Sequence, residues 1–301
     1  MDLLKDILID LKRETPKKMI LDTDTYNEID DQFALAYAIL SPERVRLSAV
    51  TAAPFLNSRS VSPKEGMLKS YDEILRVIQL TSPNANIPVY KGAEDYLTAP
   101  DIPQITDASN AIVKIVREST ERVYIVVIGC ITNIASAILQ APDICEKAVV
   151  IWLGGHALHW QNTREFNMRQ DLYASQIVFQ SQIPLIQIPC WGMCSELHTT
   201  LPELEFYLRD KNPLCNYLLD EAKKYAEGHE YAWSKVLWDV AAVAVLVKPE
   251  GLDNVIIPKP ILTNDCHYAF DFSNAPYIYT RKLNRDRIFG DLFRKLSGLK
   301  F

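Results

Sequence analysis

The 301-residue sequence has no apolar run long enough to cross a membrane and no block of lysine and arginine. Its formal net charge is -6, whereas a protein that binds a nucleic-acid polymer needs a basic face to neutralise phosphates. Its six cysteines are scattered and no signal peptide is visible, a pattern typical of reduced thiols rather than of a disulfide framework. We therefore expect a cytoplasmic protein with no membrane span and no nucleic-acid polymer as partner.

The composition is that of a globular protein, with 48% hydrophobic and 23% charged residues, which is ample for a large core. No linker, repeat or low-complexity segment divides the chain, so we expect one domain over residues 1–301. Within it, residues 1–18 carry leucine and isoleucine at helical spacing. A surface-active anchor would fit this pattern, but a helix docked on the body fits it better.

Short β-branched runs alternate with amphipathic helical patterns. The expected strands are 18–21, 45–51, 87–90, 123–128, 148–153 and 183–188, and the expected helices are 32–40, 64–80, 108–117, 134–140 and 172–180. This alternation predicts a single α/β domain with a central, mostly parallel, Rossmann-like open sheet and helices on both faces.

The last third, residues 200–301, differs in pattern and is expected to add helices and short strands to the same domain. Helices are expected over 204–209, 214–226 and 233–247, and strands over 255–261, 267–270 and 277–279. Ligands of open α/β sheets bind at the carboxyl ends of the strands, so the residues that follow each strand are the functional candidates.

Five acidic side chains lie between residues 22 and 31, directly after the first expected strand. A helix N-terminus stabilises one or two such charges, and a capping role needs only one aspartate. Carboxylates held this close either raise one another's pKa or share a cation. Because no histidine or cysteine is near, the pattern favours Ca²⁺ or Mg²⁺ over zinc.

Further oxygen ligands are expected after other strands. Thr132, in Gly-Cys-Ile-Thr-Asn, could offer a backbone carbonyl, and Glu165 and Asn167 flank an aromatic residue. Asp239 lies inside an apolar stretch that we expect to be helical, where a carboxylate is unfavourable unless it is paired or bound to metal. Cys190, Cys194 and His198 are a weaker metal candidate, and we interpret the two cysteines as small buried apolar residues.

With these residues assembled, the sequence resembles the nucleoside hydrolase family, the metal-dependent N-ribohydrolases called inosine-uridine preferring. The opening motif Asp-x-Asp-x-x-x-Asp-Asp is present as Asp22, Asp24, Asp30 and Asp31 with two extra residues between the pairs. The Gly-x-x-Thr-Asn turn lies at 129–133, the Gly-Gly turn at 154–155, Glu-Phe-Asn at 165–167, and the late aspartate at 239. These motifs in this order form a specific signature.

The resemblance implies a calcium-dependent N-ribohydrolase of nucleoside salvage that cleaves a ribonucleoside to base and ribose. Ca²⁺ would be held by Asp24, Asp31, Asp239 and the Thr132 carbonyl, and Asp24 would also be the general base. The ribose hydroxyls would be bound by Asp30, Asn57, Glu165, Asn167 and Asp239. A homodimer or homotetramer is implied by the resemblance alone.

Departures from the family pattern concern the leaving base. Many members carry histidine before the late aspartate, whereas this chain has Trp238, which resembles the purine-preferring branch. Trp238 could equally be a core residue of an apolar helix. Other candidates for a leaving-group acid, or for lining the site, are His156, His159 and His229.

Two other functions fit parts of the pattern. Asp22-Thr-Asp24-Thr after an apolar strand also fits the haloacid-dehalogenase-like phosphatases, but the second acidic pair comes too early for that family. A non-catalytic protein that binds a nucleoside or another ribosyl ligand on the same fold is the other alternative. Release of free base from a nucleoside distinguishes the hydrolase from both.

Overall fold

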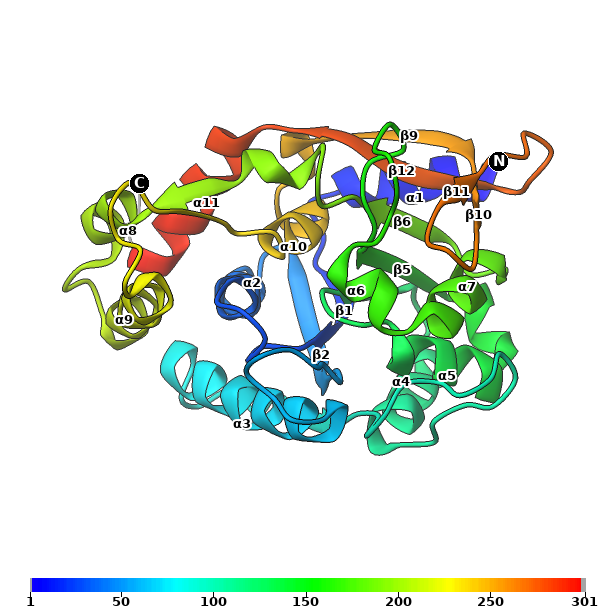
Figure 1. Cartoon of the computed structure of the whole chain (residues 1–301), viewed down its shortest axis with the longest axis horizontal. Helices are drawn as coiled ribbons and strands as arrows, with labels where there is room; N and C mark the ends of the chain where they lie inside the picture. The colour runs from blue at the N-terminus through cyan, green and yellow to red at the C-terminus, as the bar shows by residue number, and fades with distance from the viewer. Residues whose placement is uncertain (1, 299–301) are drawn as a thin grey trace.

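The computed structural model describes residues 2–298 and is built around an eight-stranded sheet in the order β3-β2-β1-β4-β5-β6-β12-β9 (Figure 1). All neighbouring strands pair in parallel except β9, which is antiparallel to β12. The strands are β1 (Lys17–Thr23), β2 (Val45–Ala52), β3 (Val89–Lys91), β4 (Val123–Val127), β5 (Ala148–Leu153), β6 (Leu185–Ile188), β9 (Leu252–Pro258) and β12 (Pro276–Leu283). The predicted fold class is therefore confirmed.

Helices cover both faces of this sheet. One hydrophobic core joins the sheet to α1 (Asp2–Lys12), α2 (Asp30–Ile39), α3 (Pro63–Thr81), α8 (Leu201–Leu208), α9 (Pro213–Ala226), α10 (Val240–Val247) and α11 (Arg285–Ser297). A second core joins the other face to α4 (Asp107–Glu118), α5 (Thr132–Gln140) and α7 (Leu172–Gln180). The remaining elements are α6 (Phe166–Gln170) and the two-stranded sheets of β7 (His198–Thr200) with β8 (Ser234–Val236) and of β10 (Ile261–Leu262) with β11 (Tyr268–Ala269).

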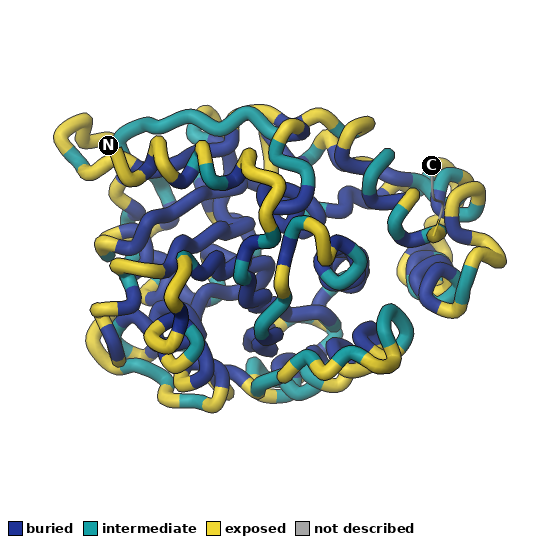
Figure 2. The backbone as a smooth tube through the Cα atoms, turned by 180° about the vertical axis from the view of Figure 1, so that it is seen from behind, coloured by how far each residue is buried: buried dark blue, intermediate teal, exposed yellow. Residues whose placement is uncertain are grey.

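The central strands are apolar on both sides because both sides face helices. In β4, Tyr124 and Val126 belong to one core, while Val123, Ile125 and Val127 belong to the other. This alternation follows from the two-residue period of a strand. Figure 2 shows the result as a continuous buried region through the middle of the molecule.

The N-terminal helix is docked on the body, as expected, with Leu4, Ile7 and Leu11 buried. It ends at Lys12 rather than at residue 18, because Lys17 and the residues after it pair with β2 in the sheet. No helix within residues 2–298 is long and apolar enough to span a membrane. Met1 and residues 299–301, which the predicted domain range includes, lie outside the described residues.

Two predictions for the last third are wrong. Residues 233–247 are not one helix, since β8 pairs with β7 and α10 begins only at Val240. The strand predicted at 255–261 runs from Leu252 to Pro258, because its register is set by pairing with β12 along its whole length. The helix α11 was not predicted.

The strand order reverses between β1 and β4, which are neighbours although β2 and β3 separate them in sequence. At such a switch point the connections leave in opposite directions and open a crevice beyond the carboxyl ends of the strands. The loop after β1, with Asp24, and the turn after β4, with Gly129, meet at this crevice. A Cβ at Gly129 would lie 3.0 Å from the carboxyl carbon of Asp24, so the glycine permits this close approach.

Candidate active site

Three aspartates from two helix N-termini converge at the switch point. Asp30 and Asp31 form the first turn of α2, and Asp239 is the residue before α10. One oxygen from each of the three lies within 4.8 Å of the others, and all three side chains are buried. The prediction that Asp239 lies inside a helix is wrong, but its position at a helix start explains how it reaches the other two.

Asp24 lies beside this group at the end of β1. Both of its carboxylate oxygens are buried and have no hydrogen-bond partner. Burial and the charges of Asp31 and Asp30 raise its pKa well above the usual range of a carboxyl. We call Asp24, Asp30, Asp31 and Asp239 the acidic cluster.

Burial and mutual repulsion affect every member of the acidic cluster. Burial and the neighbouring Asp30 raise the pKa of Asp31 to about 7, although Thr23 donates a hydrogen bond to it at 2.6 Å. Burial also raises the pKa of Asp239, followed by the charges of Asp30 and Asp31. Buried carboxylates with like-charged neighbours fit a bound divalent cation, because a cation offsets their mutual repulsion.

Asp22 is the acidic residue of the opening motif that stays outside this cluster. One of its oxygens accepts hydrogen bonds from the Thr51 hydroxyl and, at 2.8 Å, from the Asn133 amide. These contacts connect β1 to β2 and α5. Asp22 therefore has a structural role that helps to fix the loop carrying Asp24.

Thr132, predicted to offer its carbonyl to the ion, is the first residue of α5 and is buried. Its hydroxyl donates to Asp171 at 2.7 Å, and Asp171 caps α7. This contact fixes the turn after β4. A carbonyl contact from Thr132 to an ion stays a prediction.

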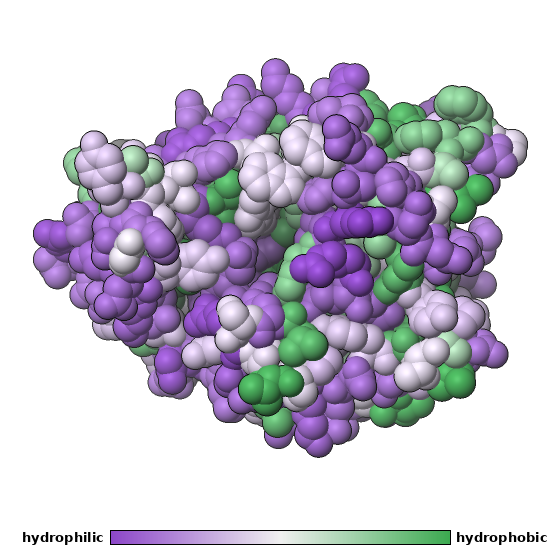
Figure 3. Space-filling view, in the orientation of Figure 1, coloured by the Kyte–Doolittle hydropathy of each residue, from purple (hydrophilic) through white to green (hydrophobic). Residues whose placement is uncertain are grey.

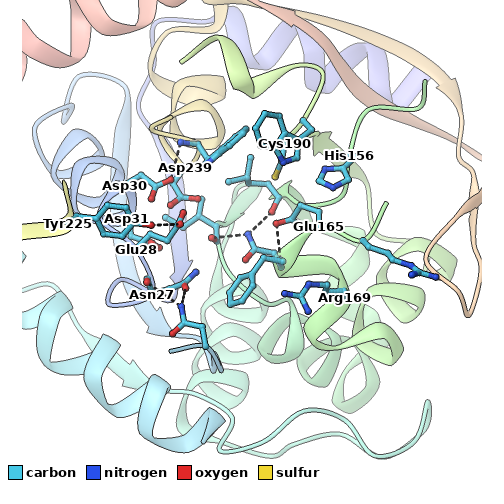
Figure 4. Close-up of a pocket in the computed structure, with 18 of the residues that line it drawn as sticks. Asn27, Glu28, Asp30, Asp31, His156, Glu165, Arg169, Cys190, Tyr225 and Asp239 are labelled. Carbon is cyan, nitrogen blue, oxygen red and sulfur yellow. Dashed lines mark hydrogen bonds between the residues drawn. The ribbon is translucent and has the colours of Figure 1, made fainter. Parts of the chain in front are cut away.

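Three members of the acidic cluster, Asp30, Asp31 and Asp239, line an open cavity of about 570 Å³, large enough for a small organic ligand, and Asp24 lies behind them. Figure 3 shows the hollow on this face of the molecule, and Figure 4 shows Asp30, Asp31 and Asp239 across the cavity from Glu165 and His156. The predicted residues that line it are Asp30, Asp31, Asn57, His156, Glu165, Asn167, Trp238 and Asp239. His159 and His229 are exposed and do not line it.

Glu165 and Asn167 form the opposite side, which we call the capped wall. Glu165 caps α6 by accepting hydrogen bonds from the backbone N–H groups of Asn167 and Met168, and it also accepts one from Gly155 at 3.0 Å. The Asn167 amide nitrogen donates to the carbonyls of Ile128 and Leu153. These bonds fix both side chains at the cavity.

Asn57 lies in the loop after β2. Its amide nitrogen donates to the Asn27 side-chain oxygen at 2.6 Å, and its own oxygen accepts from the backbone of Arg59. Asn27 belongs to the segment with two extra residues, so this segment supports the predicted sugar-binding asparagine. That contact joins two loops far apart in sequence and has no signal in the sequence.

Aromatic residues form the part of the cavity wall next to Asp239. Trp238 is half-buried against the first core and also lines the cavity, while its stacking on a base stays a prediction. Trp191 packs edge-on against it with ring centroids 5.2 Å apart. Trp191 and Tyr225 were not predicted, because only the tertiary fold brings them to the site.

His156 lines the cavity next to the Gly-Gly turn. Its side chain is buried, Nδ1 has no hydrogen-bond partner, and burial lowers its pKa to about 4. A lowered pKa disfavours the imidazolium form that would donate a proton to the leaving base. The geometry therefore favours the role in lining the site over the role of acid.

The fold brings a cavity that fits a small ligand and a group of buried carboxylates that fits a metal ion to the carboxyl edge of a parallel sheet, as in an α/β enzyme. The chain belongs to the family described as inosine-uridine preferring nucleoside hydrolase, whose model matches residues 19–275. It is therefore a nucleoside hydrolase, and neither the phosphatase alternative nor the non-catalytic alternative gains support.

Relatives in sequence and in structure agree with this family. The chain is 28% identical over 261 residues to the pyrimidine-specific ribonucleoside hydrolase RihA of Klebsiella pneumoniae, covering 77% of this chain and 80% of that protein. The RihA of an Enterobacter species is also 28% identical, with 77% and 79% covered. A purine-preferring ribonucleoside hydrolase from Gardnerella vaginalis shares the fold with a TM-score of 0.77 at 23% identity, covering 94% of this chain and 99% of that one.

Proposed function

We propose that this nucleoside hydrolase uses Ca²⁺ to split a ribonucleoside, preferably one with a purine base, into free base and ribose. One observation carries the proposal: Asp24 has two buried carboxylate oxygens without any partner, beside three more carboxylates that border the cavity. Such a cluster is unfavourable by itself and becomes favourable around a cation.

The donor set supports calcium over other divalent ions. The grouped ligands are carboxylates only, which is unlike the nitrogen and sulfur ligands of zinc. Mg²⁺ usually keeps several waters and takes one or two carboxylates, whereas Ca²⁺ accepts six to eight oxygens in a flexible geometry. Asp24, Asp31 and Asp239, together with the Thr132 carbonyl, water and the sugar hydroxyls, match the larger number.

Asp24 is the proposed general base. A bound Ca²⁺ would supply positive charge that makes a nearby water more acidic and attracts the vicinal hydroxyls of ribose. Both Asp24 oxygens are without a hydrogen-bond partner, so one of them can accept the proton of the attacking water.

The sugar would be held by residues from both sides of the cavity. Asp30 and Asp239 accept hydrogen bonds from hydroxyls on one side, and Glu165, Asn167 and Asn57 hold the ring from the others. Cleavage of the N-glycosidic bond develops positive charge on the sugar, and these carboxylates stabilise that charge at a fixed distance.

The base would pack against Trp238 and Trp191. A purine presents a larger ring surface to these indoles than a pyrimidine does, which supports the purine preference. The names of the RihA relatives favour pyrimidines instead. The substrate panel must therefore contain both classes.

The cellular setting follows the same proposal. All six cysteines are free thiols, which supports a reducing compartment such as the cytoplasm. A role in nucleoside salvage agrees with release of a reusable base. Assembly as a homodimer or homotetramer stays a prediction from the family resemblance.

The test is ribose release, by reducing-sugar assay, from inosine, adenosine, guanosine, uridine and cytidine. Each substrate is assayed with native enzyme, with enzyme treated with a calcium chelator, and after addition of excess Ca²⁺ or Mg²⁺. We expect release that the chelator abolishes and Ca²⁺ restores, with purines ahead of pyrimidines. Release that persists in chelator contradicts the calcium mechanism, and preference for uridine or cytidine contradicts the role of the tryptophans.

A further inference from the structure

A buried lysine lies directly behind the acidic cluster. Lys235, in β8, is 8% exposed, and its ammonium lies 2.7 Å from Glu28 Oε2 and 3.5 Å from Asp30 Oδ1. Among residues 2–298 it is the one lysine, arginine or histidine that forms an ion pair with any member of the acidic cluster. Glu28, in turn, accepts a hydrogen bond from the Tyr225 hydroxyl at 2.8 Å.

Lys235 acts on a particular oxygen of Asp30. Asp30 Oδ2 accepts the backbone N–H of Trp238 at 3.0 Å, while Oδ1 is buried without a hydrogen bond and faces the ammonium. The backbone contact and the lysine together restrict the rotation of the Asp30 carboxylate. None of the other three members forms an ion pair among the described residues, although the charge of Lys235 also acts to lower the pKa of Asp239.

We propose that Lys235 is a positioning residue that competes with the cation for the Asp30 carboxylate and so reserves it for the sugar. This inference rests on the proposed function, because it assumes that the acidic cluster holds a cation and that Asp30 binds a ribose hydroxyl. Four adjacent carboxylates would otherwise all turn toward a divalent ion, since each gains from it. The lysine therefore separates the ligand set of the ion from that of the substrate.

The position of Glu28 supports the same role. It lies in the segment between Asp24 and Asp30 that is two residues longer than the family motif, and its Oε2 lies 2.7 Å from the ammonium. An ammonium with two carboxylates keeps its charge, and the pair holds it 3.5 Å from Asp30 rather than among the other aspartates. Tyr225 fixes Glu28 in turn.

If Lys235 keeps Asp30 for the sugar, replacing Lys235 should change calcium affinity and KM in a way that loss of an ordinary structural ion pair would not. Replacing Lys235 by methionine removes a positive charge near the cation and frees Asp30 to turn toward it, so calcium should bind more tightly. Because Asp30 would then no longer bind the ribose hydroxyl, the KM for the nucleoside should rise. A purely structural role would weaken both calcium and nucleoside binding.

The experiment compares Lys235→Met with the wild type and with Lys259→Met. Lys259 is a matched control, because it is also buried but bonds only the carbonyl of Ser181, far from the acidic cluster. Calcium affinity is measured by calorimetry on metal-free protein at pH 8, without substrate, and KM and kcat are measured at saturating Ca²⁺. We expect Lys235→Met to bind calcium on the order of tenfold more tightly and to raise KM on the order of tenfold, with Lys259→Met unchanged in both.

The outcomes separate this inference from the proposed function. If the wild type neither binds calcium nor releases ribose, the proposed function fails. If the wild type does both, and Lys235→Met weakens calcium binding or leaves it unchanged, the inference alone is overturned. Should the methionine variant not fold, Lys235→Gln keeps a hydrogen-bond donor for Glu28 and must show the same two opposite shifts.

Discussion

The acidic cluster and the capped wall contain similar side chains, but they differ in how completely the protein itself satisfies them. Asp24 has no hydrogen bond to either oxygen, whereas Glu165 accepts three from backbone N–H groups. Helix capping fixes a carboxylate and stabilises the fold. Leaving Asp24 without donors among like-charged neighbours lowers the stability of the metal-free protein and prepares the site for a ligand that supplies positive charge.

The largest effect of the contrast between the acidic cluster and the capped wall is expected when Asp24 is replaced. We expect Asp24→Asn to lower kcat about 10²- to 10⁴-fold, because an amide cannot accept the proton of water. In chelator the same variant should unfold at a higher temperature than the wild type, because it removes a buried charge from three like charges. Steady-state rates and thermal unfolding in chelator and in Ca²⁺ measure the two effects.

The control for Asp24→Asn is Asp253→Asn. Asp253 lies in β9, and its side chain, 46% exposed, pairs with Arg281 of β12. Asp253→Asn should change neither kcat nor the unfolding temperature in chelator appreciably. If Asp24→Asn destabilised the metal-free protein, Asp24 would have partners in solution that stabilise its charge, and the contrast between the two walls would be lost.

In the capped wall, removing the carboxylate charge should destabilise the protein, whereas at Asp24 it should stabilise the metal-free protein. Glu165→Gln replaces a carboxylate that serves three donors by a single amide oxygen, so we expect a loss of about 1–2 kcal/mol in the free energy of unfolding, with or without Ca²⁺. Urea unfolding in chelator and in Ca²⁺ measures it. A loss seen only with Ca²⁺ present would place Glu165 among the metal ligands instead.

Thr200→Ala is the matched cap variant, because Thr200 accepts the backbone N–H of Glu203 at the start of α8, away from the cavity. It should show a similar loss of stability with unchanged kcat. Glu165→Gln should lower kcat as well, since Glu165 also faces the sugar.

The acidic cluster could be predicted because its chemistry is local in sequence. Asp24, Asp30 and Asp31 lie within eight residues after an apolar strand, and that density of charge has no structural explanation by itself. The residues of the capped wall were predicted as polar side chains that follow a strand, and their role as sugar ligands was predicted only through the resemblance to the family. The sequence does not show that Glu165 caps α6. Nor does it show that Asn167 donates to the carbonyls of Ile128 and Leu153, because these carbonyls are placed by the ends of β4 and β5.

Residues that the tertiary fold brings to the site were missed. Lys235 lies in a three-residue strand inside an apolar stretch, where a short strand and a helix cannot be distinguished by periodicity. The same ambiguity placed Asp239 inside a helix rather than at its start. Tyr225 and Trp191 come from a helix end and a loop whose positions are set by packing rather than by local pattern.

His156, whose ring is buried without a partner for Nδ1, should make the stability of the protein depend on pH. Its pKa is lowered to about 4, so the folded protein binds fewer protons there than the unfolded chain between about pH 4 and pH 6.5. Stability from this group is therefore present above pH 6.5 and is lost as pH falls toward 4, by no more than about 3 kcal/mol. His156→Phe should flatten that part of the stability curve, measured by urea unfolding from pH 4 to pH 8.

The same variant decides between the two predicted roles of His156. A neutral imidazole gives no acid limb to kcat above pH 6, so the pH–rate profile of His156→Phe should keep the shape of the wild-type profile. Loss of a wild-type limb in that range would identify His156 as the leaving-group acid.

The smallest effect is expected at Trp238, where the cavity meets the core. Trp238→Phe keeps an aromatic ring but reduces the surface available to the base, so the ratio of kcat/KM for inosine to that for uridine should fall about 2- to 10-fold. Stability should fall as well, because Trp238 also packs against the first core. Trp160→Phe is the control, since Trp160 is 46% exposed and stacks on the outer side of Trp191. If the ratio did not change while stability fell, Trp238 would be a core residue only, and base preference would depend on Trp191 and Tyr225.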